Sequence, residues 1–365
     1  MQARSQNITI HEVAAEAGVS IKTVSRVLRH EHDVSDATRA RVQETIARLN
    51  YVPHSSARMM ASTTSNVIGL VVVEAAQVPY EYRMRLQMGA LDACRESGFG
   101  LRMEVVAIND PQAGERLVQQ VRQREMGGYV LASRSALVPG LCGALDEAGV
   151  KYVSLVGYPA PGGVFAVSAD DRAAMRAITR MVLEAGHRRI GFLRGNQGLL
   201  DAEERYQGFM DAMMEAGVPV NPAMVVPGVF DFESGRRGAA QLLEMAEPPT
   251  AIIASSDDMA AGVISRAHEC GLRLPRDLSV TGFDDVNIAH KLWPPLTTVH
   301  RPIEKMSEVA TRQLISVLKP VRSGKQPSPV HNVQVHCEIV SRASVVPPGG
   351  TAIDPVSSLH LLSES

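Results

Sequence analysis

One four-residue pattern recurs along most of the chain and constrains its fold more than any other feature. A glutamate, a small residue, a glycine and an apolar residue follow one another at 96–99, 147–150, 215–218 and 269–272, with a close variant at 184–187. A glycine in this position adopts the left-handed conformation that ends an α-helix. Strand-like apolar runs follow several of these helix ends, and the expected strands are 100–106, 151–156, 189–193, 251–255 and 279–283. Repeated helix and strand units predict doubly wound parallel sheets, and there are too many for one domain, so we expect an α/β core of two lobes.

The first sixty residues show a different pattern, that of short helices. Thr9 and Glu12 have the spacing of a capping box, and apolar residues then recur with helical spacing as far as Gly18. Ser20 is placed to cap a second helix, and a third is expected to begin after Ser35. Two short helices joined through a glycine turn, with a third behind them, predict an all-α helix-turn-helix domain.

The charge of the chain is unevenly distributed. The 365 residues carry a net charge of −2, which excludes a uniformly basic nucleic-acid-binding protein. Residues 1–62 contain eight lysines and arginines against six acidic residues, a net charge of +2 that leaves −4 on the remainder. This mild asymmetry favours a polyanionic partner for the N-terminal segment.

Several other classes of protein are not expected. The apolar run that begins at Val67 ends at Glu74, too short to cross a membrane, and the N-terminus has no apolar signal segment. The four cysteines form no CxxC pair, which favours free thiols in a reducing cytosol. His331, His336 and Cys337 match no standard zinc spacing, so we expect no metal and no cofactor. The chain also lacks the GxSxG, GxxxxGK[ST] and HExxH motifs, and we expect no enzymatic activity.

The N-terminal motif resembles that of the LacI/GalR family of bacterial transcription regulators. The resemblance rests on residues 8–28, on Val34-Ser35 with Thr38-Arg39 and Val42, and on residues 49–53. It extends through the core, where the similar motifs are 186–190, Arg205 with Gly208-Phe209, 234–235, 249–252, 256–260, 279–285 and 294–299. The resemblance implies a helix-turn-helix domain followed by a two-lobed core like that of periplasmic binding proteins.

By this resemblance the second helix enters the major groove of DNA. Arg26 is then placed to bind guanine in a bidentate manner, Lys22 to donate to guanine or phosphate, and Ile21 to contact a thymine methyl. Without the surrounding motif these would be three exposed positions on a helix. The residues expected at the DNA are Thr9, Ser20, Ile21, Lys22, Thr23, Ser25, Arg26, Arg29, Ser55, Ala57, Arg58 and Met60.

The resemblance also implies a hinge helix in the linker, folding on the minor groove when two subunits bind together. Related proteins usually insert a leucine between base steps, whereas this chain has Met60, a more flexible side chain whose register is less well fixed. Arg58 is expected to face phosphate or the groove floor. The alternative for this segment is an unstructured tether.

A small effector is expected between the two lobes. The resemblance assigns Arg205 and Asp284 as a polar clamp for a sugar-like molecule, since a guanidinium donates and a carboxylate accepts hydrogen bonds from hydroxyls. Phe230 and either Tyr80 or Tyr82 would supply flat apolar contact, and the remaining candidates are Asp170 and Ser256. A structural ion pair is the alternative for Arg205 with Asp284, and a helix N-cap is the alternative for Asp170.

These inferences predict a definite domain order. We expect the DNA-binding domain at 1–54, the hinge at 55–65, the core at 66–346 and a flexible tail at 347–365. Within the core we expect an N-terminal lobe of 66–169 with 300–328, and a C-terminal lobe of 170–299 with 329–346. The predicted function is that of a cytoplasmic, homodimeric, effector-controlled repressor of transcription, whereas a periplasmic-type solute receptor and an enzyme are the alternatives.

Overall fold

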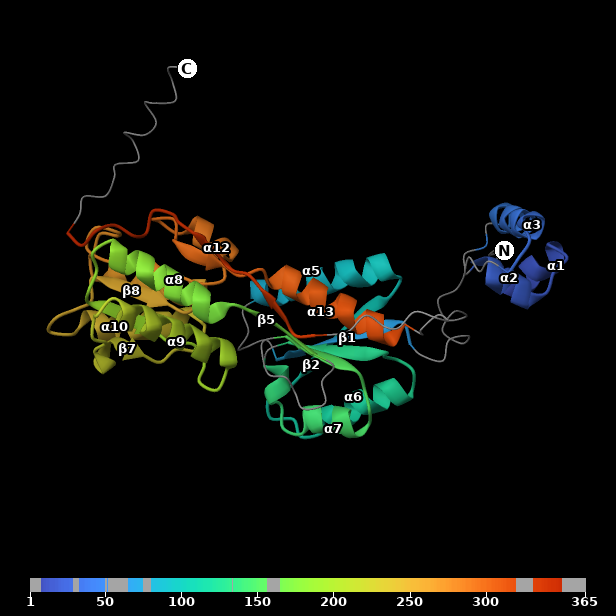
Figure 1. The fold of residues 1–365 in the computed structure, drawn as a ribbon, viewed down its shortest axis with the longest axis horizontal. Coiled ribbons are helices and arrows are strands. Elements are labelled where there is room, and N and C mark those ends of the chain that lie inside the picture. The colour runs from blue at the N-terminus through green and yellow to red at the C-terminus, as the bar shows by residue number, and fades with distance from the viewer. Residues whose placement is uncertain are drawn as a thin grey trace, which may run out of the picture. The chain divides into compact units, whose positions relative to one another are not determined.

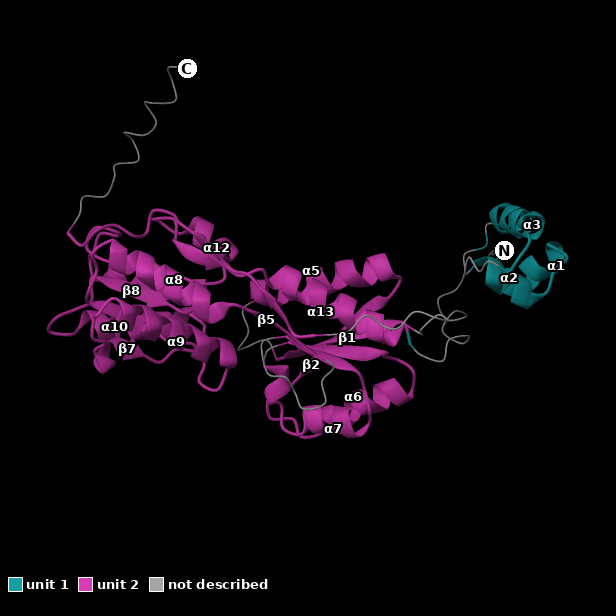
Figure 2. Cartoon of the chain, in the orientation of Figure 1, with its two compact units in different colours: residues 1–65 teal, residues 66–365 magenta. Residues whose placement is uncertain are grey.

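The chain forms two compact units, residues 1–65 and 66–365 (Figure 2). The computed structural model describes residues 8–28, 33–49, 51, 65–74, 80–132, 134–155, 165–319 and 331–349. None of the described helices combines the length and apolarity needed to cross a membrane.

The described part of the first unit contains three short helices. They are α1 (Ile10–Glu16), α2 (Ile21–Leu28) and α3 (Asp36–Arg48). The predicted capping box is confirmed, because the Thr9 side chain accepts a hydrogen bond from the Glu12 amide and the Glu12 carboxylate accepts one from the Thr9 amide. The unit has its own apolar core, formed by Val13, Ala14, Ala17, Val24, Val27, Val34, Val42 and Tyr51.

The N-terminal lobe of the second unit, here called the N-lobe, contains a parallel sheet in the order β11-β5-β4-β3-β1-β2. Its strands are β1 (Val67–Val73), β2 (Gly100–Val106), β3 (Gly128–Leu131), β4 (Tyr152–Leu155), β5 (Phe165–Ala169) and β11 (Val333–Val335). Among the described residues, helices α5 (Tyr80–Ser97) and α13 (Ile303–Leu318) cover one face of the sheet, and α6 (Ala113–Arg122) and α7 (Leu141–Glu147) cover the other (Figure 1). Cover on both faces explains why β1 is a continuous apolar run.

The C-terminal lobe, or C-lobe, repeats this plan with the parallel order β7-β6-β8-β9. Its strands are β6 (Ile190–Leu193), β7 (Val225–Val226), β8 (Ala251–Ala254) and β9 (Ser279–Thr281). Alternate residues face opposite sides, so that Phe192 packs with α8 (Asp171–Glu184) and α9 (Leu200–Glu215), and Leu193 with α10 (Phe232–Leu243) and α11 (Asp257–Glu269). The predicted two-lobed, doubly wound α/β core is therefore confirmed.

The chain passes between the lobes three times. The first crossover joins β5 to α8, the second joins β10 (Thr298–His300) to α13, and the third joins β11 to β12 (Glu338–Val340). Strand β11 pairs with β5 in the N-lobe sheet, which places the third crossover at residues 336–337, later than the boundary expected at 329. A three-residue edge strand carries no sequence signal of the sheet that it joins, and this is why the expected boundary was too early.

Glycines end the helices as the sequence pattern predicts. Gly98, Gly149, Gly186, Gly217 and Gly271 all have positive φ angles, between 65° and 102°. A left-handed residue at this position stops the helix and turns the chain into the following segment. The repeated motif is therefore a true marker of helix ends in this chain.

Gly208 has a different role, at the contact between α8 and α9. A β-carbon at this position would collide with the carbonyl oxygen of Arg172. We expect Gly208→Ala to lower the free energy of unfolding by about 1–3 kcal/mol, because α8 and α9 would have to separate. The control is Gly143→Ala in α7, where a β-carbon meets no atom within 4 Å and better helix propensity should add about 0.5–1 kcal/mol. Urea unfolding of both variants checks the prediction, and equal effects at the two sites would contradict it.

Candidate functional site

The N-terminal half of α2 presents polar and apolar side chains on its outer face. Val24 and Val27 are buried against the core of the first unit, whereas Ile21 is 41% exposed and Lys22 is also exposed. The other predicted α2 residues, Thr23, Ser25 and Arg26, are half-buried. The first turn of α2 is thus exposed, while the inner face of the helix anchors it to the core of the unit.

Two serine and threonine side chains predicted at the DNA take part in helix caps. The Ser20 hydroxyl accepts a hydrogen bond from the Thr23 amide at 3.1 Å and lies 2.9 Å from the Thr23 hydroxyl. The Thr9 hydroxyl lies 2.9 Å from a Glu12 carboxylate oxygen, within the capping box. The predicted contacts Arg29, Ser55, Ala57, Arg58 and Met60, and with them most of the hinge, lie outside the described residues.

The predicted effector residues gather at the carboxyl ends of the C-lobe strands, where open α/β sheets bind ligands. Arg205 of α9 is only 1% exposed and donates from Nη2 to Asp284 Oδ1 at 3.1 Å, just beyond β9. Its Nη1 donates to the carbonyl oxygen of Ser255, beyond β8, at 2.5 Å. The guanidinium carbon lies 3.8 Å from the centre of the Phe283 ring and 5.5 Å from that of Phe230.

Arg205 also belongs to a larger group of buried charges that the sequence did not predict. Its Nε donates to Asp171 Oδ1 at 2.9 Å, and the other Asp171 oxygen accepts from Arg301 Nη2 at 3.1 Å. Arg301 Nη1 lies 3.7 Å from Asp201 Oδ2. We call these five residues, Asp171, Asp201, Arg205, Asp284 and Arg301, the buried charge cluster. The available sequence signal was the occurrence of charged residues directly at the ends of apolar strands.

The charges of the cluster stabilise one another. Burial opposes the charged form of Asp171, but Arg301 and Arg205 outweigh it and lower the pKa of this carboxyl. Burial likewise opposes the charged form of Arg205, yet the Asp284 and Asp171 carboxylates raise its pKa. For Asp284, burial prevails over the nearby arginines and its pKa is raised. The Arg205–Asp284 ion pair, defined by its 3.1 Å separation, is part of a network that also connects to Arg301 through Asp171.

Backbone strain is concentrated at the same place. Phe230, Asp284 and Asp285 have φ angles of 67°, 103° and 53°, values that residues other than glycine rarely adopt. The Phe230 ring packs directly over Gly195, where a β-carbon would collide with it. Such strain persists only where the surrounding structure enforces it, and it clusters at functional sites.

The structure places the remaining predicted effector residues in different surroundings. Ser256 caps α11, since its hydroxyl accepts a hydrogen bond from the Met259 amide at 3.3 Å and donates to the Phe230 carbonyl oxygen. Tyr80 is 70% exposed, whereas Tyr82 is partly buried and packs against the main apolar core.

Asp170 occupies the N-cap position of α8, but its side chain makes no capping hydrogen bond. Its carboxylate instead accepts a hydrogen bond from the Cys337 amide at 2.7 Å and pairs with His336 Nδ1 at 2.6 Å. The contacts join the first crossover to the third. Among the described residues, no group of three or more histidine, cysteine or acidic side chains is arranged to hold a metal ion, and the four cysteines are free.

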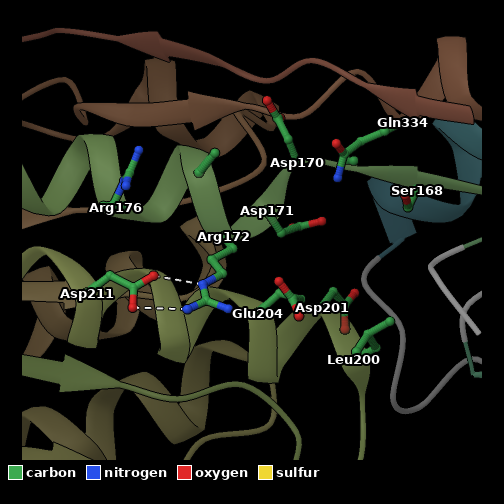
Figure 3. A pocket seen from close by; sticks show the side chains of 12 residues that line it. Ser168, Asp170, Asp171, Arg172, Arg176, Leu200, Asp201, Glu204, Asp211 and Gln334 are labelled. Carbon is green, nitrogen blue, oxygen red and sulfur yellow. Dashed lines mark hydrogen bonds and ion pairs between the residues drawn. The ribbon is translucent and has the colours of Figure 1, made fainter.

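A pocket of about 520 Å³ opens beside the cluster, between the starts of α8 and α9 (Figure 3). Asp171 and Asp201 line it, so that two members of the buried charge cluster border this space. Arg172, which also lines the pocket, pairs with both oxygens of Asp211, at 2.7 and 3.0 Å (Figure 3). The pocket therefore gives solvent an approach to the crossover side of the cluster.

The two lobes also touch beside Asp284. The Glu81 carboxylate of α5 accepts a hydrogen bond from the amide of Asn287, the first residue of α12 (Asn287–Lys291), at 2.9 Å. Arg85 of α5 donates to the carbonyl oxygen of Asp285 at 2.8 Å. Any change in lobe orientation must alter these contacts.

Asp258, at the start of α11, gives the stability of the fold a pH dependence that can be tested. Burial and neighbouring carboxylates, above all Asp284, raise the pKa of Asp258 from 3.8 to about 6. A carboxyl with a raised folded-state pKa stabilises the fold when protonated, and this stability is lost as the pH rises through about 6. We expect Asp258→Asn to raise the free energy of unfolding at pH 8 by about 1–2 kcal/mol, allowing for solvent screening, and by less at pH 4. Urea unfolding at both pH values checks this, and an equal effect at the two would contradict it.

Models of known protein families match two parts of the chain. Residues 9–54 match the bacterial regulatory proteins of the lacI family, and residues 179–345 match the periplasmic binding protein-like domain. The first range covers the three-helix unit, and the second covers most of the C-lobe together with α13.

Whole-length relatives agree with these matches. The HTH-type transcriptional repressor PurR of Yersinia pestis (strain Pestoides F) is 32% identical over 339 residues, which is 92% of this chain and 96% of that protein. The transcriptional regulator CelR in complex with cellobiose is 30% identical, with a TM-score of 0.68 over 92% of this chain and 99% of that one. The lac repressor dimer bound to operator and the anti-inducer ONPF shares the fold, with 23% identity and a TM-score of 0.75 over 93% of this chain and 100% of that one. The helix-turn-helix unit, the two-lobed core and these relatives together show that the chain belongs to the lacI family of bacterial regulatory proteins.

Proposed function

We propose that this protein is a sequence-specific transcriptional repressor whose affinity for operator DNA is controlled by a small sugar-like effector. The observation that carries the proposal is the combination in one chain of an exposed α2 first turn with a polar and aromatic site at the strand ends of the C-lobe. Operator binding would place its action in the cytoplasm. No enzymatic activity is part of the proposal.

The DNA-binding role is supported by the surface of α2. Lys22 and Ile21 are exposed on its first turn, and Arg26 lies one turn further along the helix. In a helix-turn-helix protein these positions contact base edges, and we propose that Ser20 and Thr9, at the helix caps, contact phosphates. Insertion of Met60 into the minor groove stays a prediction.

The effector-binding role is supported by the chemistry around Asp284. Its side chain is 17% exposed, and only Oδ1 is engaged by Arg205, which leaves acceptor capacity for a ligand hydroxyl. Phe230 and Tyr82 provide partly buried aromatic surface, which suits the apolar face of a sugar ring. CelR, 30% identical to this chain, forms a complex with cellobiose, and cellobiose is therefore the first probe to test.

Control of DNA affinity requires that the effector favour one lobe orientation over another. A ligand shifts such an equilibrium only by its difference in affinity for the two states. Contacts of Asp285 and Asn287 with α5 lie next to Asp284, so a ligand at Asp284 is well placed to favour one arrangement of these contacts. The chain would transmit the change to the DNA-binding unit through the linker.

A homodimer is supported by one face of α5. Tyr80, Met84, Met88 and Leu91 are exposed large apolar side chains, and their spacing places them along one side of the helix. A contiguous apolar stripe of this kind marks an interaction surface, and methionines adapt well to a partner. We propose that a second copy of the chain covers it.

We expect Met88→Glu to weaken the dimer at least tenfold, because a charge would have to be buried in the interface. The control is Met214→Glu on α9, since Met214 is 74% exposed and is not part of the α5 stripe. Sedimentation equilibrium of both variants measures the effect. Unchanged association of the Met88 variant would contradict the assignment of this face.

The proposed function is tested by selecting binding sequences from a pool of random duplexes with the full chain. We expect recovery of a roughly palindromic site. Gel shifts on that site with cellobiose, glucose, galactose and ribose then test effector control. Recovery of no preferred sequence would refute the DNA-binding proposal, whereas sugar binding without a preferred DNA sequence would indicate a solute receptor.

A further inference from the structure

Arg301, in the second crossover, lies in an unusual environment for a charged residue. It follows β10 directly and precedes α13, at the point where the chain leaves the C-lobe for the N-lobe. The side chain is 1% exposed. A buried guanidinium is tolerated only when it is paired, so its partners show what it does.

Both partners of Arg301 lie at the starts of C-lobe helices. Nη2 donates to Asp171 Oδ2 at 3.1 Å, and Asp171 is the first residue of α8, immediately after the first crossover. Nη1 lies 3.7 Å from Asp201 Oδ2, at the start of α9. Arg301 therefore ties the second crossover to the first and to the helix that carries Arg205.

Asp171 divides its two oxygens between two arginines. Oδ2 accepts from Arg301, and Oδ1 accepts from Arg205, whose Nη2 in turn binds Asp284. The path Arg301–Asp171–Arg205–Asp284 is thus a continuous chain of charge-assisted hydrogen bonds from a crossover to the ligand-facing carboxylate. The Nη atoms of Arg301 face Asp171 and Asp201, and Arg301 acts on the site through Asp171.

We propose that Arg301 is a positioning residue that fixes the relative orientation of the two lobes and couples it to the Arg205–Asp284 pair. The coupling to a ligand rests on the proposed function, whereas the role of Arg301 in lobe orientation does not depend on it. A change of lobe orientation alters the backbone at the crossovers. The Arg301–Asp171 pair makes the first two crossovers move together, because separating them would take from Asp171 one of its two arginines and leave the buried Arg301 with Asp201 at 3.7 Å.

The first experiment measures lobe orientation without any sugar. Spin labels are attached at Glu147→Cys on α7 and Met214→Cys on α9, both exposed sites, with Cys270 and Cys142 replaced by serine. Distances are recorded on full chain diluted with unlabelled protein, which suppresses distances between copies. For Arg301→Gln we expect a broader distance distribution than for wild type, or a maximum displaced beyond the width of the wild-type peak.

Matched variants separate positioning from general stability. Arg172→Gln removes an arginine that joins α8 to α9 through Asp211 but does not involve a crossover, and it should leave the distribution unchanged. Arg301→Lys keeps the positive charge, and its distance distribution should be narrower than that of Arg301→Gln. Asp171→Asn neutralises the carboxylate that joins the two crossovers and serves if Arg301→Gln does not fold. A wild-type distribution in folded Arg301→Gln, or in Asp171→Asn where the first does not fold, would overturn the proposal.

A calorimetric titration with cellobiose tests the coupling to the site. If wild type binds cellobiose, Arg301→Gln should bind it about tenfold more weakly, within the range typical of coupled sites, and Arg172→Gln should bind as wild type does. Unchanged affinity in Arg301→Gln would overturn the coupling. Absence of binding by wild type would refute cellobiose as the effector, and the spin-label distances would still decide the role of Arg301.

Discussion

Arg205→Ala is expected to abolish the response to a sugar effector and to lower the free energy of unfolding of the core by about 3–5 kcal/mol. Arg205 is 1% exposed and pairs with both Asp171 and Asp284, so its removal takes from Asp284 its arginine partner and leaves the buried Asp171 with Arg301 alone. Operator binding should survive, because the first unit has a core of its own. Urea unfolding and gel shifts with and without sugar measure the two effects.

The control for this prediction is Arg172→Ala. Arg172 also pairs with an aspartate, Asp211, but the pair is half exposed at the surface and should contribute little to stability. A normal sugar response by Arg205→Ala would show that the Arg205–Asp284 pair is only structural. A stability loss no larger than that of Arg172→Ala would contradict the assigned role of the buried charge cluster.

Arg26→Ala is expected to remove sequence selectivity while leaving both units folded. A bidentate contact with guanine contributes about 1–3 kcal/mol of discrimination, and a symmetric dimer makes the contact twice. Weak binding to any duplex should remain, since phosphate contacts carry no sequence information. Competition between the selected operator and a scrambled duplex, at fixed salt, measures the ratio of the two affinities.

Arg48→Ala is the matched control in the same unit. Arg48 lies on α3 and pairs with Glu16 at 2.8 Å. Arg48→Ala removes one positive charge, as Arg26→Ala does, so both variants lose the same general electrostatic attraction to DNA. We expect this variant to weaken binding to both duplexes equally. If Arg26→Ala kept the operator selectivity of wild type, α2 would not contact the bases through Arg26.

Much of the local structure could be predicted from sequence, because its causes lie within a few residues. The Thr9 and Glu12 cap, the glycine helix ends and the five expected core strands depend on hydrogen bonds and steric limits between near neighbours. The same holds for the two-lobed core, which follows from the repeated alternation of helix and strand.

Side-chain roles at the site were harder to predict. Ser256 and Asp170 have residue types that suit both a cap and a ligand contact, and only the structure shows that Ser256 caps α11 while Asp170 binds the third crossover. The sheet partner of β11 was equally hidden, since a three-residue strand has no pattern that distinguishes one sheet from another.

The sequence by itself determined the three-helix unit, the doubly wound lobes and the family. Only the tertiary structure decided that Arg205 and Arg301 share one aspartate, because Asp171 lies 34 and 130 residues away from them along the chain. Contacts between residues so far apart in the chain produce no local sequence pattern, such as a periodicity or a helix cap. They form when two lobes and three crossovers bring distant buried charges together, since each of those charges must find a partner once it is removed from water.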